Sequence, residues 1–277
     1  MVLVGGGGVL ALQDYSQPIG ASTEAALVEP DMPQGQPTPS GNSTTKEQHI
    51  RVYLGQGCFW ERQWAYFKVE TDDDGPFRRT PSSFSAYVGY AGGKMPNEGG
   101  AVCYHTGDDR DYTTLGHGEA VQLELDASSA AQQLSALARD FFDAFTGRDG
   151  QRSRPDPMDR GAPYRSFVGL PGGMQSPLYA TFAKENTHGM HLKEGKGSDQ
   201  DAFNTVWVYD TTAFPFFAGE VYHQNHCNFF QSEGMPYPDS YTVRLWDELK
   251  ASGHFEQTGC PEEFASHRSC GPSLSFR

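Results

Sequence analysis

One cysteine in this 277-residue sequence is placed where it could act as a nucleophile. The apolar residues 50–54 predict a strand, Gly55-Gln56-Gly57 a turn and residues 59–67 a helix, which puts Cys58 at a helix N-terminus. Free N–H groups and the helix dipole favour the reactive thiolate there. A free cysteine is also often a small buried apolar side chain, and the spacing alone leaves both interpretations open. The two aromatic residues after the sulfur, Phe59 and Trp60, could wall an apolar pocket and favour the nucleophile slightly.

Three further segments place polar side chains at the ends of predicted strands. Tyr90 lies in the glycine-containing segment 88–93, and Tyr164 lies in the segment 159–166 at a loop-to-strand junction. Glu119 begins an apolar strand, where apolar surroundings favour a neutral carboxyl group that can serve as a general acid. Each residue also has a simpler interpretation: a turn for the tyrosines and a solvent-exposed charge for Glu119.

A metal site is the weaker interpretation of the segment from His223 to Cys227. The two residues are four apart on a predicted helix and could face one ion. A closed zinc site would need Cys260 or Cys270 to return from the C-terminal tail, because two ligands are too few. We therefore expect no metal, and a zinc-stabilised interaction domain remains a minor alternative.

Taken together, these segments resemble the type A peptide methionine sulfoxide reductase family. The resemblance covers roughly residues 50–230 and rests on ordered motifs rather than on any one of them. The motifs are Gly57-Cys58-Phe59-Trp60, Val88-Gly89-Tyr90-Ala91-Gly92-Gly93, Gly116-His117-Gly118-Glu119-Ala120 and Asp159 to Ser166, followed by His223-Gln224.

The resemblance implies a thiol-dependent reduction of the S epimer of methionine sulfoxide, free or in proteins, and thus repair of oxidised proteins. It implies a compact sandwich with a ferredoxin-like core. By analogy, the roles would be as follows: Cys58 attacks the sulfur, Glu119 protonates the sulfoxide oxygen, Tyr90 and Tyr164 hydrogen-bond that oxygen, Asp159 supports the site, and Phe59 and Trp60 hold the substrate methyl group.

The same resemblance implies no cofactor and an external thiol reductant such as thioredoxin. Attack would leave Cys58 as a sulfenic acid, which a second thiol converts to a disulfide. We rank the candidates for this second, resolving cysteine as Cys260, then Cys270, then Cys227, and expect Cys103 to be structural. Direct attack by the external reductant remains an alternative.

The chain departs from the family pattern at several positions. Glu61 stands where glycine is frequent, Pro163 precedes Tyr164, and the segments 105–115 and 174–200 are enlarged. These departures keep two other functions open. One is a reductase of the same fold that acts on another small sulfoxide, and the other is a non-catalytic module that binds oxidised methionine.

The amino-acid composition disfavours nucleic acid and membranes as binding partners. With 21 Lys and Arg against 35 Asp and Glu, the formal net charge is −14, which disfavours nucleic acid. No apolar run approaches the roughly 20 residues that span a bilayer, so we expect no membrane partner. Five cysteines suit a thiol enzyme in a reducing compartment. We expect a cytoplasmic monomer, or an organellar protein if residues 1–46 belong to a targeting segment.

Interleaved helix and strand patterns predict an α/β two-layer sandwich with a mixed or antiparallel sheet. We expect a disordered or targeting segment over 1–46, a catalytic domain over 47–252 and an irregular, mobile tail over 253–277. Further strands are predicted over 84–90, 119–126, 164–170, 205–209 and 214–217. The clearest helix has its apolar face over 134–145, with Ser128 or Ser129 as its cap and Gly147 as its end, and further helices are predicted over 175–187, 219–230 and 241–250.

Overall fold

The structure is a computed structural model, and all the residues it describes belong to one unit, Lys46–Arg277. The expectations for residues 1–46, for the helix over 241–250 and for most of the C-terminal tail lie outside the described residues. Within the described part, no helix is both long and apolar enough to cross a membrane. The described residues are 49–80, 83, 85–97, 100–145, 154, 158–202, 204–226 and 260–261.

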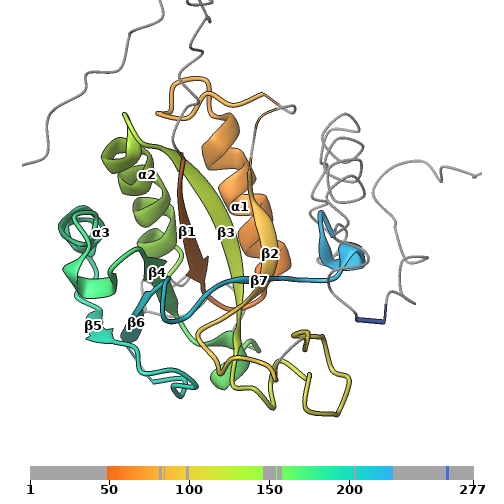
Figure 1. Ribbon diagram of the computed structural model, residues 1–277. Helices are drawn as coiled ribbons and strands as arrows, with labels where there is room; N and C mark the ends of the chain where they lie inside the picture. The colour runs from red at the N-terminus through yellow and green to blue at the C-terminus, as the bar shows by residue number, and fades with distance from the viewer. Residues whose placement is uncertain are drawn as a thin grey trace, which may run out of the picture. The chain divides into compact units, whose positions relative to one another are not determined.

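The described chain is built on a seven-stranded mixed sheet with the order β5-β6-β4-β1-β3-β2-β7 (Figure 1). In the centre, β1 pairs antiparallel with both β3 and β4, and β2 pairs antiparallel with β3 and β7. At one edge, β6 pairs parallel with β4 and β5. The strands are β1 His49–Gly55, β2 Tyr87–Ala91, β3 Gly118–Asp126, β4 Phe167–Leu170, β5 His191–Glu194, β6 Thr205–Asp210 and β7 Phe217–Ala218.

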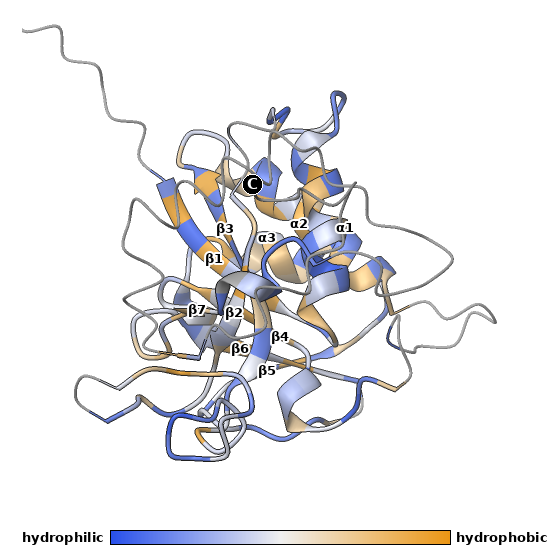
Figure 2. Ribbon diagram, turned by 90° about the vertical axis from the view of Figure 1, so that its right-hand side faces the viewer, coloured by the Kyte–Doolittle hydropathy of each residue, from blue (hydrophilic) through white to orange (hydrophobic). Residues whose placement is uncertain are grey.

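The two long helices lie on the same side of this sheet (Figure 2). They are α1, Phe59–Thr71, and α2, Ala130–Asp143; α3, Tyr179–Lys184, is shorter. Helix α2 forms because its apolar residues recur at helical spacing, so that one stripe is buried. Three short 3₁₀ segments complete the elements: η1 Ala162–Tyr164, η2 Gly173–Gln175 and η3 Val221–His223.

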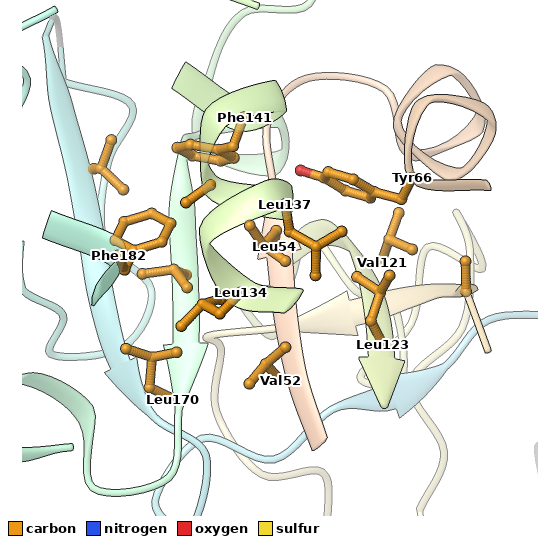
Figure 3. Packing of buried hydrophobic residues seen from close by; sticks show 14 of the residues in the cluster. Val52, Leu54, Tyr66, Val121, Leu123, Leu134, Leu137, Phe141, Leu170 and Phe182 are labelled. Atoms are coloured by element: carbon orange, nitrogen blue, oxygen red, sulfur yellow. The ribbon is translucent and has the colours of Figure 1, made fainter. Parts of the chain in front are cut away.

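The main core fills the space between the helices and the sheet. Figure 3 shows Leu134, Leu137 and Phe141 of α2 beside Leu54 of β1, and all four side chains are fully buried. Burying an aliphatic or aromatic side chain of this size contributes about 1.5–3 kcal/mol. The core therefore fixes β1, and with it the turn at the strand's C-terminal end.

The opposite face of the sheet is also covered. Tyr53, which alternates with Val52 and Leu54 along β1, joins Phe167 and Tyr209 in a second cluster on that face. The segment after β6 packs over it, and the Tyr53 hydroxyl donates to the carbonyl of Phe214 at 2.7 Å. This explains why β1 carries large side chains on both faces.

The α/β class and the mixed sheet are confirmed, and most of the predicted elements form at least in part, with the differences that follow. The predicted helix over 219–230 is wrong in its described part, where only the 3₁₀ turn η3 forms. Gln224 does not continue a helix but donates to and accepts from the backbone of Val88 in β2. Strand β5 was missed because its sequence, His191-Leu192-Lys193-Glu194, is polar and mostly exposed. The strands predicted over 84–90 and 164–170 begin only at Tyr87 and Phe167, and the strand predicted over 214–217 shares only Phe217 with β7.

Candidate active site

Cys58 lies where the sequence places it, between the end of β1 and the start of α1. It is the N-cap residue of α1, and its carbonyl accepts the N–H of Arg62 at 3.3 Å. Its side chain is 7% exposed, and it is the free cysteine of the described chain. The residue is therefore mostly enclosed by the surrounding chain.

Two carboxyl groups bind the backbone N–H groups of Cys58 and of the residue after it. Asp159 Oδ2 accepts the N–H of Cys58 at 2.8 Å, and Glu119 Oε2 accepts the N–H of Phe59 at 3.0 Å. Both N–H groups lie at the start of a helix, where they have no intrahelical partner and where the dipole favours negative charge. Residues from three distant segments thus meet at one helix N-terminus.

Gly57 allows this approach. Its φ of +70° lies in the left-handed region, and a Cβ there would come within 2.9 Å of Asp159 Oδ2. Its N–H donates to the carbonyl of Tyr164 at 3.1 Å, which ties the glycine turn to the segment 159–166. Glycine is therefore favoured at the position before Cys58, because any side chain there would be strained and would crowd Asp159.

Glu119 is in a state suited to donating a proton. Its side chain is 2% exposed, and burial raises the pKa of its carboxyl group to about 8, partly offset by the hydrogen bond from Phe59 N–H. The Tyr112 hydroxyl lies 3.4 Å from Glu119 Oε1. At neutral pH the carboxyl group is therefore mostly protonated, as expected for a general acid.

The expected thiolate at Cys58 is not the resting state. Burial, followed by the negative charge at Glu119, raises the pKa of the Cys58 thiol well above its usual value. The backbone N–H groups of Trp60 and Glu61 lower that pKa, as the helix N-terminus predicts, but their effect is smaller. The prediction was wrong in direction because it counted the helix end and not the burial.

The Tyr90 hydroxyl has a partner that the sequence did not predict, and its expected contact with the sulfoxide oxygen stays a prediction. Tyr90 is fully buried and its hydroxyl donates to Glu220 Oε2 at 2.7 Å, so it is committed to another carboxyl group. Two half-buried tyrosines interact electrostatically with both Cys58 and Glu119 instead. These are Tyr164, whose expected role stays a prediction, and Tyr104, which sequence reasoning missed.

Tyr104 and Tyr112 belong to the loop between β2 and β3. Their ring centroids are 5.5 Å apart in a stacked arrangement. The rings meet because the loop folds back on itself, with an isolated backbone β-bridge between Cys103 and Asp111. Negative charge at Glu119 and Cys58 adds to burial in raising the pKa of Tyr104 to about 12, so its hydroxyl stays a donor. The sequence signal was only two tyrosines in a segment without periodicity.

The two aromatic residues after Cys58 have different surroundings. Phe59 is 1% exposed and packs near Tyr90 and His223, whereas Trp60 is partly exposed. Trp60 Nε1 donates to His223 Nδ1 at 3.1 Å, and the Trp60 ring stacks on His226 at 3.7 Å. Trp60 is thus held in place and offers an apolar surface beside the cysteine.

Two residues of the sequence motifs, Arg165 and His117, hold the strand ends in place and are not part of the Cys58–Glu119 site. The buried Arg165 guanidinium donates to the carbonyls of Gly92 and Gly116 and to the Tyr209 hydroxyl. His117 Nδ1 accepts the N–H of Gly93, and a Cβ on Gly93 would meet the His117 ring at 2.6 Å. These contacts lock the ends of β2, β3 and β4 together, which positions Glu119.

The candidate resolving cysteines are only partly described. Cys260 is buried and forms a disulfide with Cys103, not with Cys58. Cys227 and Cys270 lie outside the described residues. In this state Cys260 is therefore not the free thiol that was expected in a mobile tail, and its partner is the cysteine expected to be merely structural.

Comparison with known proteins gives three findings. No model of a known protein family matches the chain. The peptide methionine sulfoxide reductase MsrA of Methylococcus capsulatus is 26% identical over 192 residues, which cover 69% of this chain and 68% of that protein. The MsrA of Xanthomonas campestris pv. campestris is 29% identical over 118 residues, 43% of this chain and 44% of that protein.

Among solved structures, methionine sulfoxide reductase A of Corynebacterium diphtheriae matches with a TM-score of 0.40 and 18% identity, over 66% of this chain and 74% of that one. At this score the likeness supports no assignment by itself. The curated matches, at 26–29% identity, agree with the ordered motifs: this chain is similar to the peptide methionine sulfoxide reductases MsrA.

Proposed function

We propose that this protein reduces the S epimer of methionine sulfoxide, free or in proteins, to methionine. The observation that carries the proposal is the pair of Cys58 and a mostly neutral Glu119 at the N-terminus of α1. The similarity to MsrA proteins over about two thirds of the chain supports the same activity.

The proposed chemistry begins with a proton transfer. A sulfoxide oxygen leaves poorly unless it is protonated, and the neutral Glu119 carboxyl group supplies that proton. The resulting carboxylate takes the proton of the Cys58 thiol as the sulfur attacks, so the acid is regenerated. The cysteine sulfur bonds to the oxygen-bearing sulfur. The S–O bond of the substrate and this transient S–S bond then break as the hydroxyl passes to the Cys58 sulfur, which leaves methionine and a sulfenic acid.

Electrons and atoms balance in this step. The substrate sulfur is reduced by two electrons to methionine, and the Cys58 sulfur is oxidised by two electrons to a sulfenic acid. We propose that the hydroxyls of Tyr104 and Tyr164, rather than that of Tyr90, hydrogen-bond the oxygen during the transfer. Trp60 is proposed to contact the substrate methyl group, with Phe59 supporting it from the core.

An external dithiol of the thioredoxin type is the proposed reductant, and no resident cofactor takes part. A thiol attacks the sulfenic acid, water leaves, and dithiol exchange returns Cys58 to the thiol. Our ranking of Cys260, Cys270 and Cys227 as the resolving thiol stays a proposal. Cys260 can serve only once its bond to Cys103 is reduced.

We further infer a ferredoxin-like core of two layers. The elements β1-α1-β2-β3-α2-β4 follow the order of that motif, and their strands lie in the order β4-β1-β3-β2 with antiparallel pairing. Strands β5, β6 and β7 would be additions at the two edges.

The activity test uses purified protein, dithiothreitol and the separated S and R epimers of a methionine sulfoxide peptide. Turnover of the S epimer that is lost in Cys58→Ser supports the proposal. Absence of turnover with either epimer, together with tight binding of the peptide, would identify a binding module instead. Turnover of a non-methionyl sulfoxide alone would identify a reductase of another substrate.

A further inference from the structure

Near the candidate active site lies a group of three side chains of the types that bind metal ions. The group shares no residue with the Cys58–Glu119 pair. Sulfur atoms of Cys103 and Cys260 and a carboxylate oxygen of Glu220 all lie within 4.8 Å of one another, and all three residues are buried. The three come from the β2–β3 loop, the C-terminal tail and the segment before η3. Thiolates and a carboxylate are ligands that zinc prefers in proteins.

In the described part of the chain, Glu220 has no Lys or Arg partner that would explain its burial. Its two oxygens accept the Tyr90 hydroxyl and the Tyr104 N–H, each at 2.7 Å. Among the described residues it makes no ion pair with Lys or Arg. By contrast, the equally buried Glu70 is paired with Arg79. A buried carboxyl group without a cation is costly when ionised, and a metal ion would supply the missing charge.

An independent observation at His223 also indicates a ligand beside Glu220. It is 1% exposed, its Nε2 lies 3.9 Å from Glu220 Oε2, and Nε2 has no hydrogen-bond partner. Because Nδ1 accepts the Trp60 N–H, the proton of the neutral ring sits on Nε2. Nε2 is therefore a donor, suited to a water or hydroxide held on a metal ion beside Glu220 and not to the metal itself.

We propose that reduction of the Cys103–Cys260 disulfide converts this group into a zinc site, with Cys103, Cys260 and Glu220 as ligands, a water as the fourth and His223 as its hydrogen-bond donor. The disulfide takes two electrons and two protons from an external dithiol, which is itself oxidised to a disulfide. Zn²⁺ then forms two bonds to sulfur and displaces two thiol protons to solvent. The same two cysteines are thus either a disulfide or a metal site.

This assignment differs from the site that the sequence suggested. Cys260 is grouped with Cys103 and Glu220, whereas the sequence suggested His223 and Cys227 as the ligand pair. The proposal does not rest on the catalytic role of Cys58, so each can fail without the other.

Cobalt spectroscopy of the full chain tests the proposal. The Cys58→Ser protein is used so that the catalytic thiol cannot contribute, and it is reduced with a phosphine, which is then removed without air. We expect one equivalent of Co²⁺ to bind with a thiolate-to-cobalt charge-transfer band, and Zn²⁺ to displace it. The unreduced protein should show no such band.

Variants identify the ligands. Adding Cys103→Ser should abolish the band, adding Cys227→Ser and Cys270→Ser should leave it, and adding Glu220→Gln should weaken binding by about tenfold or more. A band that survives Cys103→Ser, or one that depends on Cys227 or Cys270, overturns the assignment, as does the absence of any band after reduction.

A second measurement avoids the risk that a variant fails to fold. In the reduced Cys58→Ser protein, Zn²⁺ should protect Cys103 and Cys260, but not Cys227 and Cys270, from alkylation by iodoacetamide. Peptide mass mapping reads each cysteine separately. Equal alkylation of Cys103 and Cys260 with and without Zn²⁺ contradicts the proposal.

Discussion

Glu119 Oε2 accepts the backbone N–H of Phe59 at 3.0 Å, which brings a buried carboxyl group of β3 to the residue that follows the only free described cysteine, Cys58. The contact joins two positions 60 residues apart in the sequence. It places a proton donor and a nucleophile at one helix end, and the testable consequences below follow from that arrangement.

Replacing Glu119 by Gln should lower kcat/KM for the S epimer by about 10²–10⁴-fold, the usual contribution of a general acid. The amide oxygen of Gln can still accept the Phe59 N–H, so the fold should persist. Steady-state kinetics and thermal unfolding measure the two effects.

Glu124→Gln is the matched control for this change. Glu124 lies on the same strand but pairs with the exposed Arg51, away from Cys58. It should leave kcat/KM within about twofold, because exposed ion pairs contribute little. An equal loss in the two variants would argue that any carboxyl group on β3 matters only for stability.

The activity should decrease as the pH rises above about 8. Burial raises the pKa of Glu119 to about 8, and the neutral form is the one that donates the proton, so ionisation removes the active species. A pH profile of kcat/KM measures this limb, and Glu119→Gln should lack it. If kcat/KM instead rises through pH 8 and decreases only at the higher pH where tyrosine hydroxyls ionise, Glu119 is not the acid.

Cys58 should react slowly with alkylating reagents, and removal of the Glu119 charge should speed the reaction. At pH 9 the Glu119 carboxylate raises the pKa of the Cys58 thiol, so Glu119→Gln lowers it. Each unit by which that pKa falls raises the thiolate fraction by about tenfold. Iodoacetamide rates at Cys58, read by peptide mapping, check the prediction; an unchanged or slower rate in the variant would speak against it.

The tyrosines should separate into two classes. Tyr104→Phe and Tyr164→Phe should each lower kcat/KM by about 10- to 100-fold, the value of a hydrogen bond to a charged group of 1.5–3 kcal/mol. Tyr90→Phe should mainly reduce thermal stability, because it leaves Glu220 Oε2 without its donor. Kinetics and unfolding of the three variants decide between these assignments, and a large kinetic loss confined to Tyr90→Phe would restore the original one.

Much of the site could be predicted from sequence because it lies at element ends. Cys58 follows a strand and a glycine turn, and Glu119 begins an apolar strand, so local pattern alone places both. Arg165 and His117 belong to the same motifs, yet their frame of hydrogen bonds depends on contacts across three strands that no local pattern reveals.

The missed features are tertiary in origin. Tyr104 and the Cys103–Cys260 bond belong to a loop and a tail without periodicity, and a cysteine's partner cannot be derived from spacing. The direction of the Cys58 pKa depends on burial and on Glu119, which only the folded chain supplies.

The most direct measurement of the central claim is a single turnover without reductant. The protein is mixed with one equivalent of a methionine-(S)-sulfoxide peptide in the presence of dimedone, and both products are followed by mass spectrometry. We predict formation of the methionine peptide together with a dimedone adduct at Cys58. Formation of the methionine peptide with the adduct or oxidation confined to other cysteines, or no reduction at all, would contradict the account.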